Sequence, residues 1–200
     1  MSISSVIPVY NRAPITFEKG DGCYLFADNG DKYLDFLSGI AVNALGHNHP
    51  HLLKALSEQA NKVWHVSNIF YTAPLKRLSQ RLVDATFADT AFFCNSGTEA
   101  IEAGIKAVRK YFDENGQPDR YRIITFEGAF HGRTMGAASA TGTAKILDGF
   151  EPRLDGFDKV PVNIDAVKAA ITAQTAAILV EPIQGESGIS AAPLKILPEL

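Results

Sequence analysis

Cysteine is scarce in this sequence, and its scarcity excludes several classes of protein. The 200 residues include only two cysteines, Cys23 and Cys94. Two cysteines without a recurring spacing cannot build the disulfide framework of a small secreted domain, and they do not form a zinc-binding pattern. We therefore expect two reduced thiols, as is usual in a cytosolic protein.

The chain also lacks an excess of positive charge and any long apolar run. Its 19 Lys and Arg stand against 22 Asp and Glu, and a net charge of −3 offers no basic surface for nucleic acid. No apolar stretch approaches the roughly 20 residues that span a bilayer. The first residues lack the basic and apolar segments of a signal peptide. We expect a cytoplasmic protein that binds neither nucleic acid nor a membrane.

The chain contains enough apolar residues for a core, and its first part has the pattern of short β-strands. Apolar residues make up 46% of the sequence, and its length suits one domain or a part of a larger one. Residues 15–37 have the pattern of short strands around the turn sequence Asp-Asn-Gly-Asp at 28–31. His47, His49 and His51 alternate further on, but Pro50 is placed to open a helix. No metal site is expected there, because no carboxylate or thiol completes a ligand set.

From residue 74 onward, helical and strand patterns alternate. Short apolar runs predict buried strands at residues 91–93, 122–126 and 176–180. Start signals predict helices from Pro74, after residue 96 and from Asn163, whereas the small-residue stretch up to about Thr143 has no clear period. This alternation indicates an α/β fold with a mostly parallel sheet flanked by helices.

Polar, glycine-containing turns follow all three predicted strands, at residues 95–98, 127–133 and 181–188. In open α/β sheets, ligands bind at the carboxyl ends of the strands, so we expect these turns to converge on one site. No GxGxxG or GxxxxGK[ST] motif follows a strand, so the fingerprints of NAD and nucleoside triphosphate sites are missing.

The first of these turns leads directly into a helix. Backbone N–H groups at a helix N-terminus lack partners and lie at the positive end of the helix dipole, which suits a phosphate. Gly97 permits close approach of a ligand, and Ser96 and Thr98 add hydroxyl groups. The alternative is that Ser96 or Thr98 only caps the helix. This stretch by itself does not decide between the two.

Five side chains at the other two turns are candidates for a binding site. Phe130 can lie against a planar cofactor or pack in the core. Arg133 can bind a carboxylate bidentately or form a surface ion pair, and His131 can act as an acid or base or be structural. Glu181 and Glu186 can pair with a cation, transfer a proton or form loop salt bridges.

Three motifs, in this order, resemble those of the class III aminotransferases that use pyridoxal phosphate. They are Asn-Ser-Gly-Thr-Glu-Ala at 95–100, Phe-His-Gly-Arg-Thr at 130–134 and Glu-Pro-Ile-Gln-Gly-Glu at 181–186. Within that class, residues 39–47, 85–89 and 92–97 are similar to the pattern of the enzymes that act on acetylornithine. Three motifs in order are far more specific than any one alone, and the resemblance covers nearly the whole chain.

The resemblance implies a role for five of these residues. Gly97 and Thr98 would bind the cofactor phosphate, and Phe130 would stack on the pyridine ring. Arg133 would bind the α-carboxylate of the substrate. Glu186 would be the gating glutamate, which pairs with a downstream arginine and is displaced between the two half-reactions.

The resemblance also implies the fold type I of pyridoxal-phosphate-dependent transferases, which is the fold of aspartate aminotransferase. Residues 1–50 would belong to the small domain, and residues 51–200 would be the first part of an incomplete large, cofactor-binding domain. The Schiff-base lysine, and the Asp that keeps the pyridine nitrogen protonated, are expected downstream of Leu200. We therefore expect no catalytic residue in this chain, which would be the N-terminal half of the enzyme. Lys106 and Lys145 do not lie at strand-end turns and are not candidates.

The activity implied is transfer of the terminal amino group of N2-acetyl-L-ornithine to 2-oxoglutarate by a homodimer. The products would be N-acetylglutamate 5-semialdehyde and glutamate, in arginine biosynthesis. Ile40 stands where ornithine aminotransferases carry a tyrosine, which disfavours that activity. The alternatives are another class III aminotransferase, acting on succinylornithine, ornithine or 4-aminobutyrate, an aminomutase, and a non-catalytic fragment.

Overall fold

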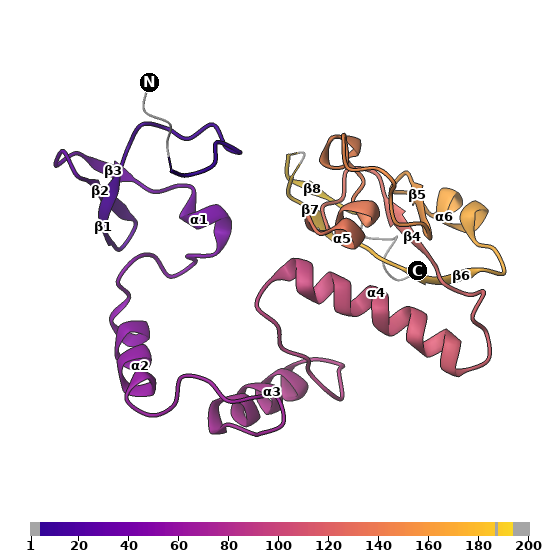
Figure 1. Ribbon diagram of the computed structural model, residues 1–200, viewed down its shortest axis with the longest axis horizontal. Helices are drawn as coiled ribbons and strands as arrows, with labels where there is room; N and C mark the ends of the chain where they lie inside the picture. The colour runs from indigo at the N-terminus through magenta and orange to yellow at the C-terminus, as the bar shows by residue number, and fades with distance from the viewer. Residues whose placement is uncertain (1–4, 187, 194–200) are drawn as a thin grey trace. The chain divides into compact units, whose positions relative to one another are not determined.

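The structure is a computed structural model that describes residues 5–186 and 188–193 (Figure 1). Its internal contacts divide the chain into two compact units, Met1–Phe87 and Ala88–Leu200. The assignment of residues 1–50 to a small domain and of 51–200 to a large one stays a prediction.

The first unit contains a three-stranded antiparallel sheet with β2 in the centre. Its strands are β1 (Phe17–Asp21), β2 (Tyr24–Ala27) and β3 (Lys32–Leu34). Between β2 and β3, the Asn29 side chain accepts a hydrogen bond from the Asp31 N–H at 3.0 Å. Gly30 follows Asn29 with φ at +89°, a conformation that favours glycine. The predicted strands and their turn are confirmed.

Three helices follow this sheet in the chain. They are α1 (Ser38–Ala41), α2 (Pro50–Ala60) and α3 (Ala73–Ala85). Helix α2 begins at Pro50 as predicted, and α3 begins one residue before Pro74, with the Thr72 hydroxyl accepting the Leu75 N–H. The short α1 was not predicted, and all four of its residues have φ between +47° and +63°.

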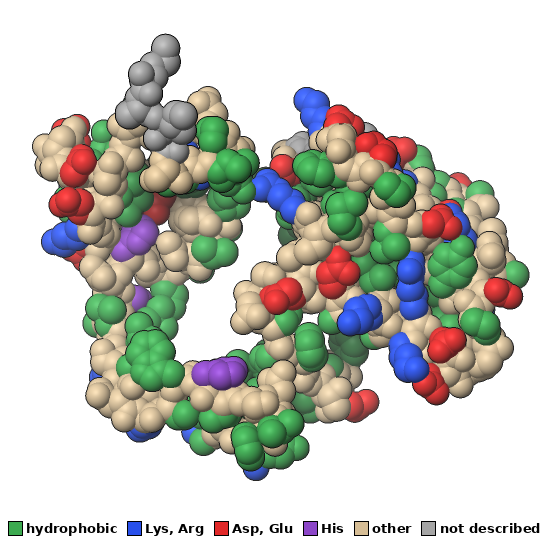
Figure 2. Space-filling view, viewed as in Figure 1, with side chains coloured by type: hydrophobic (Ala, Val, Ile, Leu, Met, Phe, Trp, Pro, Cys, Tyr) green, Lys and Arg blue, Asp and Glu red, His purple; other side chains and the backbone are tan. Residues whose placement is uncertain are grey.

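The predicted apolar faces of α2 and α3 exist, but they are exposed. Leu56 on α2 is 62% exposed and Trp64, beyond its end, is 82% exposed. Hydrophobic side chains are visible at the surface over both helices (Figure 2). Among the described residues of this unit, only Ala27 is buried.

The second unit is built on a parallel sheet in the order β5-β4-β6 (Figure 1). Its strands are β4 (Arg122–Phe126), β5 (Phe157–Val160) and β6 (Thr175–Ile178). The central β4 contributes Ile124 and Phe126 to the core, where they pack with Val160 and Val167. The predicted parallel sheet is confirmed, as is the strand at 122–126; the strand predicted at 176–180 is formed over 175–178. Strand β5 was missed because its sequence, Phe-Asp-Lys-Val, is half charged.

Helices and a hairpin surround this sheet in the chain. They are α4 (Gly97–Glu114), α5 (Met135–Ala140), the 3₁₀ turn η1 (Ala144–Ile146), α6 (Ile164–Ala170), and the paired β7 (Ile183–Gln184) and β8 (Ser190–Ala191). Helices α4 and α6 start where they were predicted. Helix α5 was missed because residues 136–140 are all small and buried, so no polar face marks a period. Within the described ranges, no helix is long and apolar enough to cross a membrane.

The strand predicted at residues 91–93 is not formed. No described residue pairs with this segment, and the three strands of the parallel sheet pair only with one another. Phe92 is 73% exposed and lines a hollow of about 830 Å³ along α4. An apolar run becomes a strand only where a neighbour accepts its backbone hydrogen bonds, and this segment has none within the described part of the chain.

Candidate active site

The N-terminus of α4 is closed by a reciprocal set of hydrogen bonds. The Ser96 hydroxyl accepts the Glu99 N–H at 3.3 Å and donates to the Glu99 carboxylate at 3.0 Å, which also accepts the Asn95 N–H at 2.8 Å. Hydrogen bonds from Asn95, and then from Ser96, lower the pKa of Glu99 below its usual value. This resembles a capping box, with Glu99 accepting the N–H of the residue before the cap, so the capping role left open by the sequence falls to Ser96.

The cap leaves the next two backbone donors of α4 available. No described residue accepts a hydrogen bond from the backbone N–H of Gly97 or Thr98. At Gly97, nothing lies within 4 Å of the position that a Cβ would occupy. These two N–H groups therefore lie at the positive end of an 18-residue helix, where an anion is favoured.

The Thr98 side chain is committed to a network that ties α4 to α5. The Thr134 hydroxyl donates to the Glu102 carboxylate, so Thr98 must be the donor in its own 3.2 Å contact with Thr134. The same carboxylate accepts the Ala137 N–H at 3.1 Å, and Thr134 is the N-cap of α5. Gly132 lies so close to Thr98 that a Cβ there would overlap the threonine side chain.

No sequence motif indicated that these residues form a network at the site. Glu102 and Thr134 are 32 residues apart. The one local signal was Thr134, which precedes Met-Gly-Ala-Ala. A threonine there is recognised as an N-cap only if the residues after it are recognised as a helix.

The turn after β4 carries the second group of candidates. Phe130 is half-buried, and Arg133 is exposed immediately before α5. His131 is only 6% exposed; its backbone N–H donates to the Thr141 hydroxyl at 3.1 Å, whereas the Nε2 of its ring has no partner among the described residues. Burial lowers the pKa of His131, and the Glu181 carboxylate opposes that shift. His131 is therefore held as a neutral imidazole beside Phe130.

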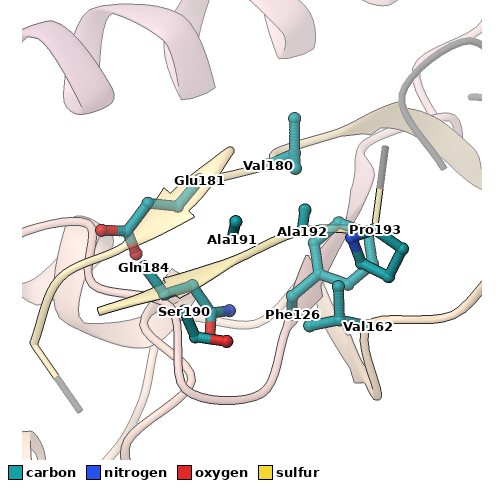
Figure 3. Close-up of a pocket in the computed structure, with 9 residues that line it drawn as sticks. All are labelled: Phe126, Val162, Val180, Glu181, Gln184, Ser190, Ala191, Ala192 and Pro193. Atoms are coloured by element: carbon teal, nitrogen blue, oxygen red, sulfur yellow. The ribbon is translucent and has the colours of Figure 1, made fainter. Parts of the chain in front are cut away.

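The turn after β6 carries the third group. Glu181 lies at the wall of a cavity of about 250 Å³ at the carboxyl end of the sheet (Figure 3). The cavity is lined by Phe126, Val162, Val180, Glu181, Gln184, Ser190, Ala191, Ala192 and Pro193. The Glu181 carboxylate points away from the apolar side chains at the other end (Figure 3). Glu186 is exposed two residues beyond β7.

The structure thus brings the three predicted turns together within the second unit. The first meets the second where Thr98 lies against Gly132 and contacts Thr134, the residue that follows the turn. The second meets the third where the Phe130 N–H donates to Glu181 at 2.8 Å. Arg133 and Glu186 lie on two of these turns with exposed side chains. The roles predicted for the individual residues stay predictions.

The fold and this arrangement define an α/β domain in which a helix N-terminus and two polar strand-end loops lie together. More specifically, the chain belongs to the aminotransferase class-III family, whose profile matches residues 7–200.

Relatives with curated names support this membership. The chain is 59% identical to acetylornithine aminotransferase 1 of Bradyrhizobium diazoefficiens, over 98% of the chain and 49% of that relative. It is 55% identical to the acetylornithine aminotransferase of Mesorhizobium japonicum, over 100% of the chain and 50% of the relative. The chain thus spans about half the length of the curated relatives that it matches.

Solved structures confirm the fold. An ornithine aminotransferase from Toxoplasma gondii matches with a TM-score of 0.90 at 29% identity, over 97% of this chain and 46% of that one. The N-acetylornithine aminotransferase of Stenotrophomonas maltophilia matches with a TM-score of 0.77 at 39% identity, over 95% of this chain and 48% of that one. The predicted class, an aminotransferase fold of type I preceded by a β-containing segment, is confirmed.

Proposed function

We propose that the protein carrying this chain is a pyridoxal-phosphate-dependent acetylornithine aminotransferase. It would move the terminal amino group of N2-acetyl-L-ornithine to 2-oxoglutarate. The observation that carries the proposal is the meeting of two strand-end turns with the N-terminus of α4, where two backbone N–H groups have no acceptor among the described residues. The chain is also 59% identical to an acetylornithine aminotransferase.

The chemistry of the α4 N-terminus fits the phosphate of this cofactor. The backbone N–H groups of Gly97 and Thr98 would hold the phosphate, and Gly97 leaves space for its close approach. Because the Thr98 hydroxyl donates its proton to Thr134, the main-chain groups would supply the first donors. The Toxoplasma gondii relative is described as holding pyridoxal phosphate at its active site.

The remaining candidates would bind and orient the reactants. The Phe130 ring would lie against the pyridine ring, and Arg133 would bind the α-carboxylate of either substrate through its guanidinium fork. Glu186 would be the gating glutamate and pair with an arginine further downstream in the complete enzyme. When bound, pyridoxal phosphate supplies the electron sink for moving the amino group, and the protein supplies binding, orientation and electrostatics.

Ornithine aminotransferase is the second candidate, because the Toxoplasma gondii enzyme has the higher TM-score of the two neighbours above. Overall fold is shared across many activities, whereas identity of 59% to an acetylornithine enzyme and Ile40 in place of a tyrosine favour the first candidate. A panel of acetylornithine, succinylornithine, ornithine and 4-aminobutyrate separates them. Acetylornithine should give the highest kcat/KM, and a preference for ornithine would replace the proposal.

The phosphate role is tested at Gly97. A leucine there would crowd the two free N–H donors, so Gly97→Leu should weaken pyridoxal phosphate binding at least tenfold in a cofactor titration. The matched control is Gly104→Leu, because Gly104 also lies in α4 with nothing near its Cβ position. Equal cofactor affinity in the two variants would remove the phosphate site from this helix.

The substrate role is tested at Arg133. Lysine keeps the charge but loses the planar fork. Arg133→Lys should therefore cost roughly 1.5–3 kcal/mol, or about ten- to a hundredfold in kcat/KM. Both half-reactions should be affected in single-turnover kinetics, since both substrates carry an α-carboxylate, while cofactor content stays unchanged. Arg153→Lys, at an exposed arginine near Glu151, is the control; wild-type rates for both half-reactions in Arg133→Lys would exclude the role.

We further propose that the protein works as a cytoplasmic homodimer. Exposed apolar side chains such as Trp64 support an assembly that covers them, and the two free cysteines suit a reducing compartment. Light scattering of the purified protein measures the oligomeric state, and a monomer at working concentration would contradict it.

A further inference from the structure

The turns that carry Phe130 and Glu186 are joined at one side chain, Glu181. Its Oε2 accepts the Phe130 N–H at 2.8 Å, and its Oε1 accepts the Gly185 N–H at 3.1 Å. One oxygen therefore accepts a backbone donor from the turn of Phe130, and the other accepts a donor from the turn that carries Glu181 and Glu186. The contact to Phe130 spans 51 positions in the chain and is partly buried.

A second bond joins the same two turns. The Gln184 side-chain amide donates to the Glu127 carbonyl at 2.9 Å. Gly128 has φ at +75°, and a Cβ there would lie 2.9 Å from the Gln184 Oε1. The turns thus meet at close range, and Glu181 and Gln184 lie near one another at the same end of the cavity (Figure 3).

We propose that Glu181 is a positioning residue that holds the turn of Phe130 and the turn of Glu186 at a fixed separation. An ionised carboxylate is an acceptor at both oxygens, which matches two N–H donors. Charge-assisted bonds of this kind are stronger than neutral ones. Both oxygens of Glu181 accept backbone donors, which fits a positioning role; proton transfer, the role that the sequence left open, is the alternative that the kinetics below test. The consequence for catalysis rests on the proposed function: Glu181 sets the place of the Phe130 ring and of the Glu186 carboxylate without touching the substrate.

The test is Glu181→Gln in the protein that carries this chain. Glutamine preserves the size of the side chain but replaces one acceptor oxygen with an NH₂ donor. That NH₂ group cannot accept the backbone N–H of Phe130 or Gly185, so one of the two hydrogen bonds is lost. The matched control is Glu114→Gln, because Glu114 is exposed at the far end of α4 and pairs only with Lys110 among the described residues. Hydrogen exchange of peptides covering 127–133 and 181–186 reports the separation of the turns without any need for activity. We expect both peptides of Glu181→Gln to exchange at least tenfold faster than in the wild type. The exchange rates of the control should equal those of the wild type.

Kinetics then separate positioning from catalysis. A positioning role predicts a fall of about tenfold in kcat/KM, an altered circular dichroism of bound pyridoxal phosphate, and an unchanged pH profile. A proton-transfer role predicts a loss of 10²–10⁴-fold together with one limb of the pH profile, and this outcome would overturn the proposal. A fall in thermal stability with unchanged exchange in both turns would overturn it as well.

Two further measurements keep the outcome decisive. If Glu181→Gln does not fold, Glu181→Asp keeps the charge but reaches only one donor, so faster exchange in one of the two turns is expected; unchanged exchange in both contradicts the proposal. If the wild-type protein neither binds pyridoxal phosphate nor transfers amino groups, the proposed function fails, whereas the exchange data still decide whether Glu181 holds the two turns together.

Discussion

The two units of the chain differ in how they bury apolar side chains. In the second unit, Phe126 is 1% exposed at the centre of a parallel sheet, with Ile124, Val160 and Val167 around it. In the first, Ala27 is the one buried residue among those described, and the leucines of α2 remain exposed. The first unit therefore depends on local hydrogen bonds, and the second also has hydrophobic burial.

Helices α2 and α3 show that a helix can be predicted correctly from the sequence and still lack the packing that would stabilise it. Helix α2 has 11 residues and α3 has 13, and isolated helices of about 12–15 residues or fewer are marginal in water. What stabilises most protein helices is packing of the apolar face, and within the described residues that face is unpacked in the first unit. Amide exchange should therefore be fast in α2 and α3 and slow in β4.

The largest expected effect comes from removing a core side chain. Phe126→Ala in the 200-residue chain should lower the free energy of unfolding of the second unit by about 3–5 kcal/mol, because it removes a buried ring and leaves a cavity. Leu56→Ala, in the exposed face of α2, should change stability by less than about 0.5 kcal/mol. Urea denaturation followed by circular dichroism measures both. Equal losses in the two variants would show that the two units share one core.

A smaller effect separates two helix caps that are alike in chemistry. Ser96→Ala removes the cap of α4, and Thr72→Ala removes the cap of α3; a lost cap costs about 1 kcal/mol. In the second unit we expect this cost to appear in global unfolding, because α4 contacts α5 and β6. In the first unit we expect only a local loss of helix, seen as faster exchange at 73–85. If Thr72→Ala lowered the free energy of global unfolding, the expected difference between the two units would be wrong.

The smallest expected effect is confined to acid pH. The pKa of His131 lies below its usual 6.5 because the ring is buried, so the unfolded chain takes up a proton first as the pH falls through 6.5. The free energy of unfolding should therefore decrease below about pH 6.5 and be unaffected above it. His131→Gln should reduce the difference in Tm between pH 7.5 and 5.5. The exposed His51, replaced by Gln, is the control from the first unit; an identical pH dependence in wild type and His131→Gln would show that His131 is not held neutral.

Much of the candidate site could be predicted because its signals are local. Ser96 and Asn163 are residue types that cap helices, and they marked the starts of α4 and α6. The predictions failed where contacts between distant parts of the chain, and not the local sequence pattern, decide the structure. Residues 91–93 are apolar but find no strand partner in the described ranges, and the buried, small-residue α5 has no polar face to reveal its period.

The sequence by itself determined the local features: where helices begin, where the turn at Gly30 falls, and which motifs place the chain among the class III aminotransferases. Only the tertiary structure decided how groups distant in the chain are paired. The Glu181 carboxylate meets the Phe130 N–H across 51 positions, and Thr134 meets Glu102 across 32. The reason is physical: capping and turn formation use groups within a few residues of one another, whereas a hydrogen bond between loops exists only after the sheet has aligned its strand ends.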